Sequence, residues 1–337
     1  MIARSGRSKD LNVLLCALTI YIRERNLIEC EEGSCRCSIM MSDLTLGILI
    51  GLLSSALFAV QMVLIRGQRR EVGALIANSI KMWVSVPLML ALVVIPWRMH
   101  EFFLPLSVLL PLAISVLMGG AFGDTVYLSS QERIGVSRAF PISNTYPIVT
   151  YLLAVFMLNQ EVALNTTIGI LVAVVGVMLV SRELTVDLES AERKAYDWKG
   201  LALAILSSVM YALATIFMQI GVTGVDPIDA NLFRMCIGSL AMMPIFSFSI
   251  KRNTRPLSKR AIRIIAFAGF FGMGLASLLY VASIKLVGAT IGAVIGSTAP
   301  LFALPVSMGY LKERVTWKGI VGTIATIVGI WFVVVGL

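Results

Sequence analysis

The chain has 337 residues, of which 58% are hydrophobic and 14% are charged. A soluble domain usually carries about 25% charged residues, so this composition excludes a soluble globular fold. The net charge of +9 does not indicate a nucleic-acid-binding protein, because the Lys and Arg residues stand in short connections between apolar segments, as the positive-inside rule describes.

An N-terminal extension, residues 1–40, precedes the first apolar segment of membrane-spanning length. Its own apolar stretch, residues 11–22, is too short to cross a bilayer and ends in charged residues. No small-residue cleavage pattern follows that stretch, and Met40-Met41 stands directly before the first span. One hypothesis is therefore that translation begins at this methionine pair.

Four of the five cysteines lie in the extension, and the fifth, Cys236, lies inside a predicted span. This distribution is not a disulfide framework. A zinc site formed by Cys30, Cys35 and Cys37 would need a fourth ligand, and the only histidine, His100, is distant in the sequence. The sequence therefore predicts neither a metal site nor a cofactor.

Apolar windows of about 18 to 24 residues recur from residue 44 to the last residue, each long enough to cross a hydrocarbon core about 30 Å thick. Glycine and proline interrupt many of them, which membrane helices tolerate because neighbouring groups satisfy the backbone. The predicted fold class is an all-α integral membrane protein with about ten transmembrane helices. We expect these helices at residues 44–65, 73–95, 105–128, 136–158, 165–181, 200–222, 228–250, 261–283, 288–310 and 317–337.

An internal repeat relates the two halves of the chain at an offset of 153 residues. The offset aligns polar and conformationally special residues, which are less common in membrane segments than Leu, Val, Ala and Gly. The aligned pairs are Ser54-Ser55 with Ser207-Ser208, Asn78 with Asn231, Lys81 with Arg234, Tyr127 with Tyr280, Gly135 with Gly288, and Pro147 with Pro300. A gene duplication accounts for this register.

Each copy holds five predicted helices, an odd number, so the second copy enters the membrane in the opposite orientation to the first. Such inverted repeats are common in secondary transporters, where two similar bundles rock about a site near the bilayer midplane. The expected organisation is an extension at residues 1–40, a first repeat at 41–183, a charged linker at 184–199 and a second repeat at 200–337.

Several short motifs recur in both repeats and carry a family resemblance. They are the Ser-Ser pairs of the first and sixth helices, the Asn-x-x-Lys and Asn-x-x-Arg stretches from Asn78 and Asn231, and a Thr-x-Pro in the fourth and ninth helices. An acidic turn also precedes the last helix of each repeat, at Glu161 and Glu313. Over residues 44–337 the chain resembles the drug/metabolite transporter superfamily, specifically its EamA type. The resemblance implies a carrier with two five-helix repeats and does not identify the solute.

Asp124 is the only acidic residue that the predicted helices place within a span rather than in a connection or at a helix end. A carboxylate at this depth costs roughly 2.5 to 3.5 kcal/mol on insertion scales and persists where it meets water, a partner or a substrate. Because burial favours the neutral form of a carboxyl group, Asp124 is the candidate for proton coupling. The alternative is a structural role near a helix end, paired with a basic residue such as Arg138.

Other polar residues inside the spans are predicted to line the solute pathway. Proline frees a backbone carbonyl, so kinks in the fourth and ninth helices would present polar groups to a central cavity. Tyr127 and Tyr280 could cover a solute or belong to an interfacial belt. Lys81 and Arg234, near the starts of the second and seventh helices, are interpreted as interfacial anchors. The predicted substrate-binding set is Asp124, Tyr127, Asn144, Thr145, Tyr146, Pro147, Tyr280, Ser297, Thr298, Pro300 and Gln61.

Basic residues lie mainly in the connections after the odd-numbered helices, for example in residues 182–199 and 251–263. The positive-inside rule places these connections in the cytoplasm and both termini outside, whereas the basic residues of the extension favour the opposite orientation. The expected location is the plasma membrane, as a multi-pass protein that is a monomer or a homodimer and whose partners are lipids, a small-molecule solute and protons.

The function predicted from these features is secondary transport of a small organic solute, an amino acid or related metabolite, by alternating access and in the direction of export. Proton coupling is a hypothesis within it. A channel or scramblase-like pore is an alternative, because it could use the same duplicated helices. A membrane-embedded enzyme is a weaker one, since the spans offer neither a second aspartate nor a His-Glu-x-x-His helix.

Overall fold

A computed structural model describes residues 34–68, 71–94, 102–134, 136–189, 197–252, 258–311 and 317–335. In these ranges the regular secondary structure is helical, as the sequence predicts. Most of the N-terminal extension, His100 and Glu313 lie outside the described residues. The hypothesis that translation begins at Met40-Met41 therefore stays a prediction.

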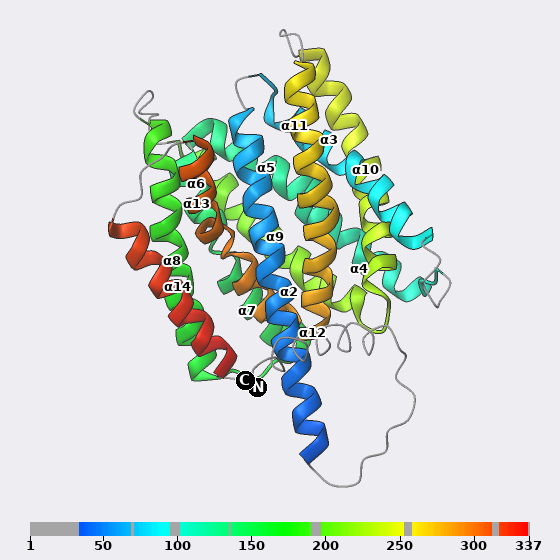
Figure 1. The fold of residues 1–337 in the computed structure, drawn as a ribbon, viewed down its shortest axis with the longest axis vertical. Coiled ribbons are helices and arrows are strands. Elements are labelled where there is room, and N and C mark those ends of the chain that lie inside the picture. The colour runs from blue at the N-terminus through cyan, green and yellow to red at the C-terminus, as the bar shows by residue number, and fades with distance from the viewer. Residues whose placement is uncertain are drawn as a thin grey trace, which may run out of the picture.

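The two halves of the chain contain corresponding helices, except that one helix of the second half runs through a bend where the first half has two helices (Figure 1). The first half consists of α2 (Ser34–Gly67), α3 (Ala74–Val94), α4 (Leu106–Val116), η1 (Leu117–Ala121), α5 (Phe122–Ile134), α6 (Val136–Ser143), α7 (Tyr146–Leu158) and α8 (Leu164–Glu189). The second half consists of α9 (Trp198–Val222), α10 (Pro227–Arg252), α11 (Lys259–Gly269), η2 (Phe270–Ala276), α12 (Ser277–Gly296), α13 (Ala299–Leu311) and α14 (Trp317–Val335).

These elements combine into about ten membrane crossings. Seven described helical stretches are long and apolar enough to span a bilayer, and Leu164–Val180 and Ile320–Val334 are shorter apolar helices. The longest stretch, Lys259–Gly296, changes direction at Gly288, whose φ of 80° is available to glycine at little cost. Residues 289–296 then continue into α13 as the ninth crossing.

Irregular segments recur in both halves at the predicted offset. The π-helix η1 begins at Leu117 and η2 begins at Phe270, both within glycine-rich sequence. The fourth crossing is broken between α6 and α7, and α7 begins one residue before Pro147. The ninth crossing is broken between α12 and α13, and α13 begins one residue before Pro300. Both breaks lie where the sequence predicts proline kinks, although we expected one continuous helix at residues 136–158.

Contacts between the halves are reciprocal, as a two-fold relation requires. Ser130 Oγ donates to the Gly200 carbonyl at 2.7 Å, and its counterpart Ser283 Oγ donates to the Gly47 carbonyl at 2.8 Å. Phe58 meets Tyr280, and their counterparts Tyr211 and Tyr127 meet each other, with ring centroids 6.4 Å apart in both pairs. The third and eighth crossings thus pack against the first helix of the other half, which confirms the inverted repeat.

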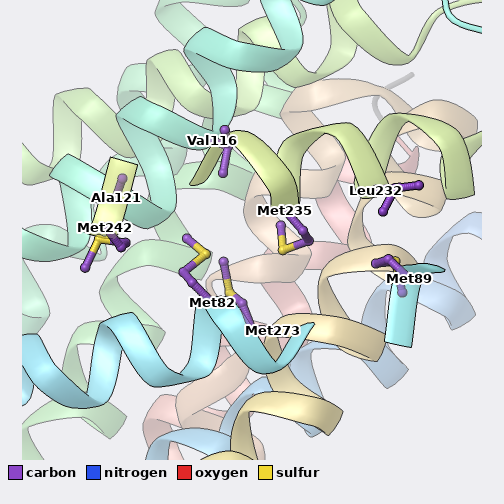
Figure 2. Packing of buried hydrophobic residues seen from close by; sticks show 8 residues of the cluster. All are labelled: Met82, Met89, Val116, Ala121, Leu232, Met235, Met242 and Met273. Atoms are coloured by element: carbon purple, nitrogen blue, oxygen red, sulfur yellow. The ribbon is translucent and has the colours of Figure 1, made fainter. Parts of the chain in front are cut away.

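A methionine-rich core lies between α3 and α10, on either side of this pseudo-two-fold axis (Figure 2). Met82 corresponds to Met235, and Met89 corresponds to Met242; all four are fully buried. Asn78 Nδ2 approaches Met242 Sδ at 3.8 Å, and Asn231 Nδ2 approaches Met89 Sδ at 3.1 Å. Methionine adapts its shape at low cost, so these side chains fill the space between the two helices without a close fit of rigid groups.

Candidate functional site

A cavity of about 320 Å³ lies among α2, α3, α5, α6 and α13. Its lining includes the last turns of α2 and the first turns of α3, helix ends that lie at the top of Figure 1. Its volume falls within the range of small-molecule sites. The lining residues are Phe58, Gln61, Met62, Val63, Ile65, Val72, Ala74, Ala77, Asn78, Lys81, Asp124, Tyr127, Leu128, Gln131, Phe140, Asn144, Ala299, Pro300 and Ala303.

An ion pair forms the most polar part of the cavity wall. Lys81 Nζ lies 2.7 Å from Asp124 Oδ2, with side chains only 15% and 22% exposed. Tyr211, from α9 in the second half, donates its hydroxyl to Asp124 Oδ1 at 2.8 Å. The aspartate is therefore held by one partner from each half of the chain.

These contacts correct two expectations about charge. The basic partner of Asp124 is Lys81, whereas the side chain of Arg138 is exposed. Lys81 is not an interfacial anchor, because its ammonium group faces Asp124 inside the bundle. The carboxylate draws it inward, since an unpaired charge at this depth would be costly.

Arg234, the counterpart of Lys81, is also buried rather than interfacial, at 5% exposed. Its Nε donates to Ser115 Oγ at 3.2 Å and its Nη1 donates to Asn231 Oδ1 at 3.0 Å. Ser277 occupies the position equivalent to Asp124 and donates its hydroxyl to Asn231 Oδ1 at 3.0 Å. The two halves share an architecture here and differ in charge.

Two cavity-lining amides have a buried polar atom without a hydrogen-bond partner. They are Gln61 Nε2 and Asn78 Oδ1, in side chains that are 6% and 3% exposed. Among the described residues only one other buried side-chain atom, Ser249 Oγ, is unpaired. Leaving such a group unpaired costs about 1 to 3 kcal/mol. Both atoms are themselves buried, so they do not face the open space of the cavity.

The predicted site residues are only partly brought together. Gln61, Asp124, Tyr127, Asn144 and Pro300 all line the cavity. The other six lie in the surrounding packing and outside its lining: Thr145, Tyr146, Pro147, Tyr280, Ser297 and Thr298.

Several of these six bond to the backbone at the broken helices. Tyr146 donates its hydroxyl to the Ala293 carbonyl at 2.9 Å, from the fourth crossing to the ninth. Ser297 Oγ donates to Val294 O at 2.7 Å, and Thr298 Oγ1 donates to Ile295 O at 2.6 Å. They bond to carbonyl groups at the end of α12, where Ala293 O and Ile295 O also accept backbone N–H groups.

Sequence analysis missed several apolar and aromatic members of the lining. On α2 these are Phe58, Met62 and Ile65. They follow one another at spacings of four and three residues and so share one helix face. That spacing was available from the sequence, but apolar residues on a membrane helix face lipid or protein equally well.

The equivalent region of the second half is closed. Five residues of the second half are the repeat counterparts of cavity-lining residues and lie in one buried hydrophobic cluster. They are Met218, Val225, Ala230, Val281 and Ile284. Val108 and Leu112 of α4 complete the cluster. The cavity is thus open at one end of the bundle, and its counterpart at the other end is sealed by side-chain packing.

Comparison with known proteins gives a consistent relationship. The model of the EamA-like transporter family matches residues 45–182 and again residues 198–335. An uncharacterized transporter of Archaeoglobus fulgidus is 25% identical over 288 residues, which cover 85% of this chain and 96% of that protein. A solved crystal structure superposes with a TM-score of 0.68 at 12% identity, covering 85% of this chain and 94% of the other, which supports the fold.

Two further relatives carry names that specify a solute. The glucose uptake protein GlcU of Staphylococcus xylosus is 28% identical over 151 residues, or 42% of this chain and 52% of that protein. A putative ribose uptake protein, RbsU, of Staphylococcus aureus strain Mu50 is 26% identical over 216 residues, or 62% of this chain and 72% of that protein.

Proposed function

Because the chain belongs to the EamA-like transporter family, we propose that it carries a small polar organic solute across the plasma membrane by alternating access. The family and the transporter-named relatives make it a transporter of small solutes and not an enzyme. The mechanism, the solute and its coupling are the parts that we propose.

The difference between the two halves carries the proposal. One half holds a cavity beside Lys81 and Asp124, while its counterpart beside Arg234 is packed shut against Leu112. Two bundles of similar structure can exchange these conformations, which would close the first cavity and open the second. A channel would instead need both ends open at once.

We propose export as the direction of transport. On the orientation predicted from the basic connections, the open end faces the cytoplasm, which suits the export predicted from sequence. Amino acids and related metabolites are the class expected from the sequence, and the relatives' names add sugars.

Asp124 is the proposed coupling residue. Its bond to Tyr211 joins α5 to α9 of the other half, so a movement that separates these two helices would break it. A proton on the carboxyl group would weaken its attraction to Lys81 and release the halves for the transition. The exchange of a proton would then accompany each change of side.

Asp124→Asn should separate exchange from accumulation. The amide keeps a similar shape, and its oxygen can still accept from Lys81 Nζ, but it cannot carry the proton. We therefore expect solute counterflow to continue while uptake driven by a pH gradient is lost. Proteoliposomes with the purified protein, measured at several pH values, provide the test. Unchanged gradient-driven accumulation and an unchanged pH response in this variant would remove the proposed role of Asp124.

A further inference from the structure

We infer that Arg234 is the anion-binding residue of the sealed half, where it takes a carboxylate group of the solute when that half opens. The inference rests on the proposed alternating access and names a chemical group of the solute. Arg234 stands 153 residues after Lys81, and each cation lies about two turns into its helix, α10 or α3. Lys81 lines the cavity, so its repeat counterpart belongs to the equivalent site of the other half.

Arg234 carries a buried charge that has no counter-ion. It is 5% exposed, and neither of the two ion pairs among the described residues includes it. Ser277 stands in the position equivalent to Asp124, so the carboxylate that compensates Lys81 has no counterpart here. A guanidinium keeps its proton, and a charge at membrane depth is costly. Such a residue indicates a pathway for a charged ligand.

The helix that seals the second half also covers Arg234. Val108 and Leu112 of α4 complete the sealed cluster, and Arg234 Nε donates to Ser115 Oγ of the same helix at 3.2 Å. Ser115 follows Leu112 by three residues and so lies on the same face of α4. A movement of α4 away from α10 would therefore open the cluster and release Nε in one step. Arg234 would then face a second cavity as Lys81 faces the first.

This movement would leave one edge of the guanidinium group free. Nη1 donates to Asn231 Oδ1 at 3.0 Å and to Ser277 Oγ at 3.5 Å, whereas Nη2 has no partner within the described part of the chain. Release of Ser115 would add Nε, which lies on the same edge as Nη2. Two parallel N–H groups match the two oxygens of a carboxylate. An uncharged solute would leave the charge of Arg234 unused.

The open half would offer the same site after one protonation. Lys81 Nζ lies 2.7 Å from Asp124 Oδ2, so the charge of the lysine is compensated in the present state. A proton on Asp124 would leave Lys81 without a counter-ion, which is the condition of Arg234. A carboxylate could then bind Lys81 in one state and Arg234 in the other, with the proton balancing its charge.

Arg234→Gln tests the site, with Arg234→Lys as the variant that keeps the charge and Arg263→Gln, at an exposed arginine of α11, as the control. Counterflow into proteoliposomes is measured for lactate, threonine and glucose, of which the first two carry a carboxylate. We expect counterflow of a carboxylate, with a half-saturating concentration raised about 10- to 100-fold in Arg234→Gln by the loss of a charge-assisted bond. Arg234→Lys should retain most of the affinity, and Arg263→Gln should match the wild type.

Two further measurements separate this site from a structural role. Arg234 lies outside the lining of the open cavity, so equilibrium dialysis of the same solute should give equal affinities for Arg234→Gln and the wild type. The melting temperature of Arg234→Gln should not fall, because the variant removes a buried charge without a counter-ion. A lower melting temperature with an unchanged half-saturating concentration would show a structural residue and overturn the site.

The solute class has its own contradicting results. Equal losses in Arg234→Lys and Arg234→Gln would show that the charge is not what binds the solute, and would overturn the inference. Saturable counterflow of glucose but of neither carboxylate would also overturn it, while leaving the carrier function intact. Failure of every solute to show saturable counterflow would instead count against the proposed function itself.

Discussion

Replacing Lys81 by methionine should abolish transport and destabilise the protein by about 3 to 5 kcal/mol, the usual cost of removing one partner of a buried ion pair. The lost ammonium group lies 2.7 Å from Asp124 Oδ2, in a pair that is largely shielded from water. The remaining carboxylate would keep only the hydroxyl of Tyr211 as a described hydrogen-bond donor. Thermal unfolding in detergent and counterflow in liposomes measure the two effects.

The double variant Lys81→Met/Asp124→Leu separates stability from function. With both charges gone, most of the stability should return, because apolar residues of similar size replace a buried pair at little cost. Transport coupled to protons should remain absent. Lys259→Met, at an exposed lysine that begins α11, is the control for loss of one positive charge. If Lys81→Met has the same melting temperature and counterflow as Lys259→Met, the ion pair contributes to neither stability nor transport.

Gly329→Ala should be strongly destabilising although it adds only a single methyl group. The α8 and α14 helices approach each other along paired glycines, and a Cβ at position 329 would come within 2.4 Å of the Ala173 backbone nitrogen. Backbone cannot move aside as a side chain does, so the helices would have to separate. Ordinary overpacking of a core costs about 1 to 3 kcal/mol. We expect Gly329→Ala to lower the free energy of unfolding by at least that amount.

The counterpart Gly176→Ala should have a similar effect, because its Cβ would come within 2.5 Å of the Thr326 backbone nitrogen. Gly73→Ala is the control, since no atom lies within 4 Å of a Cβ at that position. Melting temperatures of the three variants are the measurement. A Gly329→Ala protein as stable as Gly73→Ala would show that α8 and α14 do not pack this closely.

The repeat made most of the architecture predictable from the sequence. An offset of 153 residues aligns Gly135 with Gly288, and the structure turns the chain at Gly288 through a positive φ. The same offset aligns the starts of the two π-helices at Leu117 and Phe270. The π-helices themselves were not predicted, because glycine-rich sequence in a membrane helix is compatible with regular α-helix as well.

The site was harder to predict because its members come from five helices. Asp124 was identified from its rarity within the spans, a property of the sequence alone. Its partner Lys81 is 43 positions away, and nothing in the spacing distinguishes it from Arg138. Which half of the molecule is open could not be predicted either, because equivalent residues line both the cavity at Ala77 and the sealed cluster at Ala230.

Cysteine accessibility tests alternating access most directly. The background is a variant without the five native cysteines. Leu128→Cys then places a thiol in the cavity, and Val281→Cys places one at the equivalent position of the sealed cluster, where Val281 is 0% exposed. A state in which the sealed cluster is open should be populated at about 0.1 to 10% in the resting protein. A membrane-impermeant maleimide should therefore modify the thiol at position 281 about 10- to 1,000-fold more slowly than the thiol at position 128. During solute exchange, modification at 281 should accelerate while that at 128 slows. Rapid modification of both positions at once, unaffected by solute, would indicate a continuous pore and contradict the carrier mechanism.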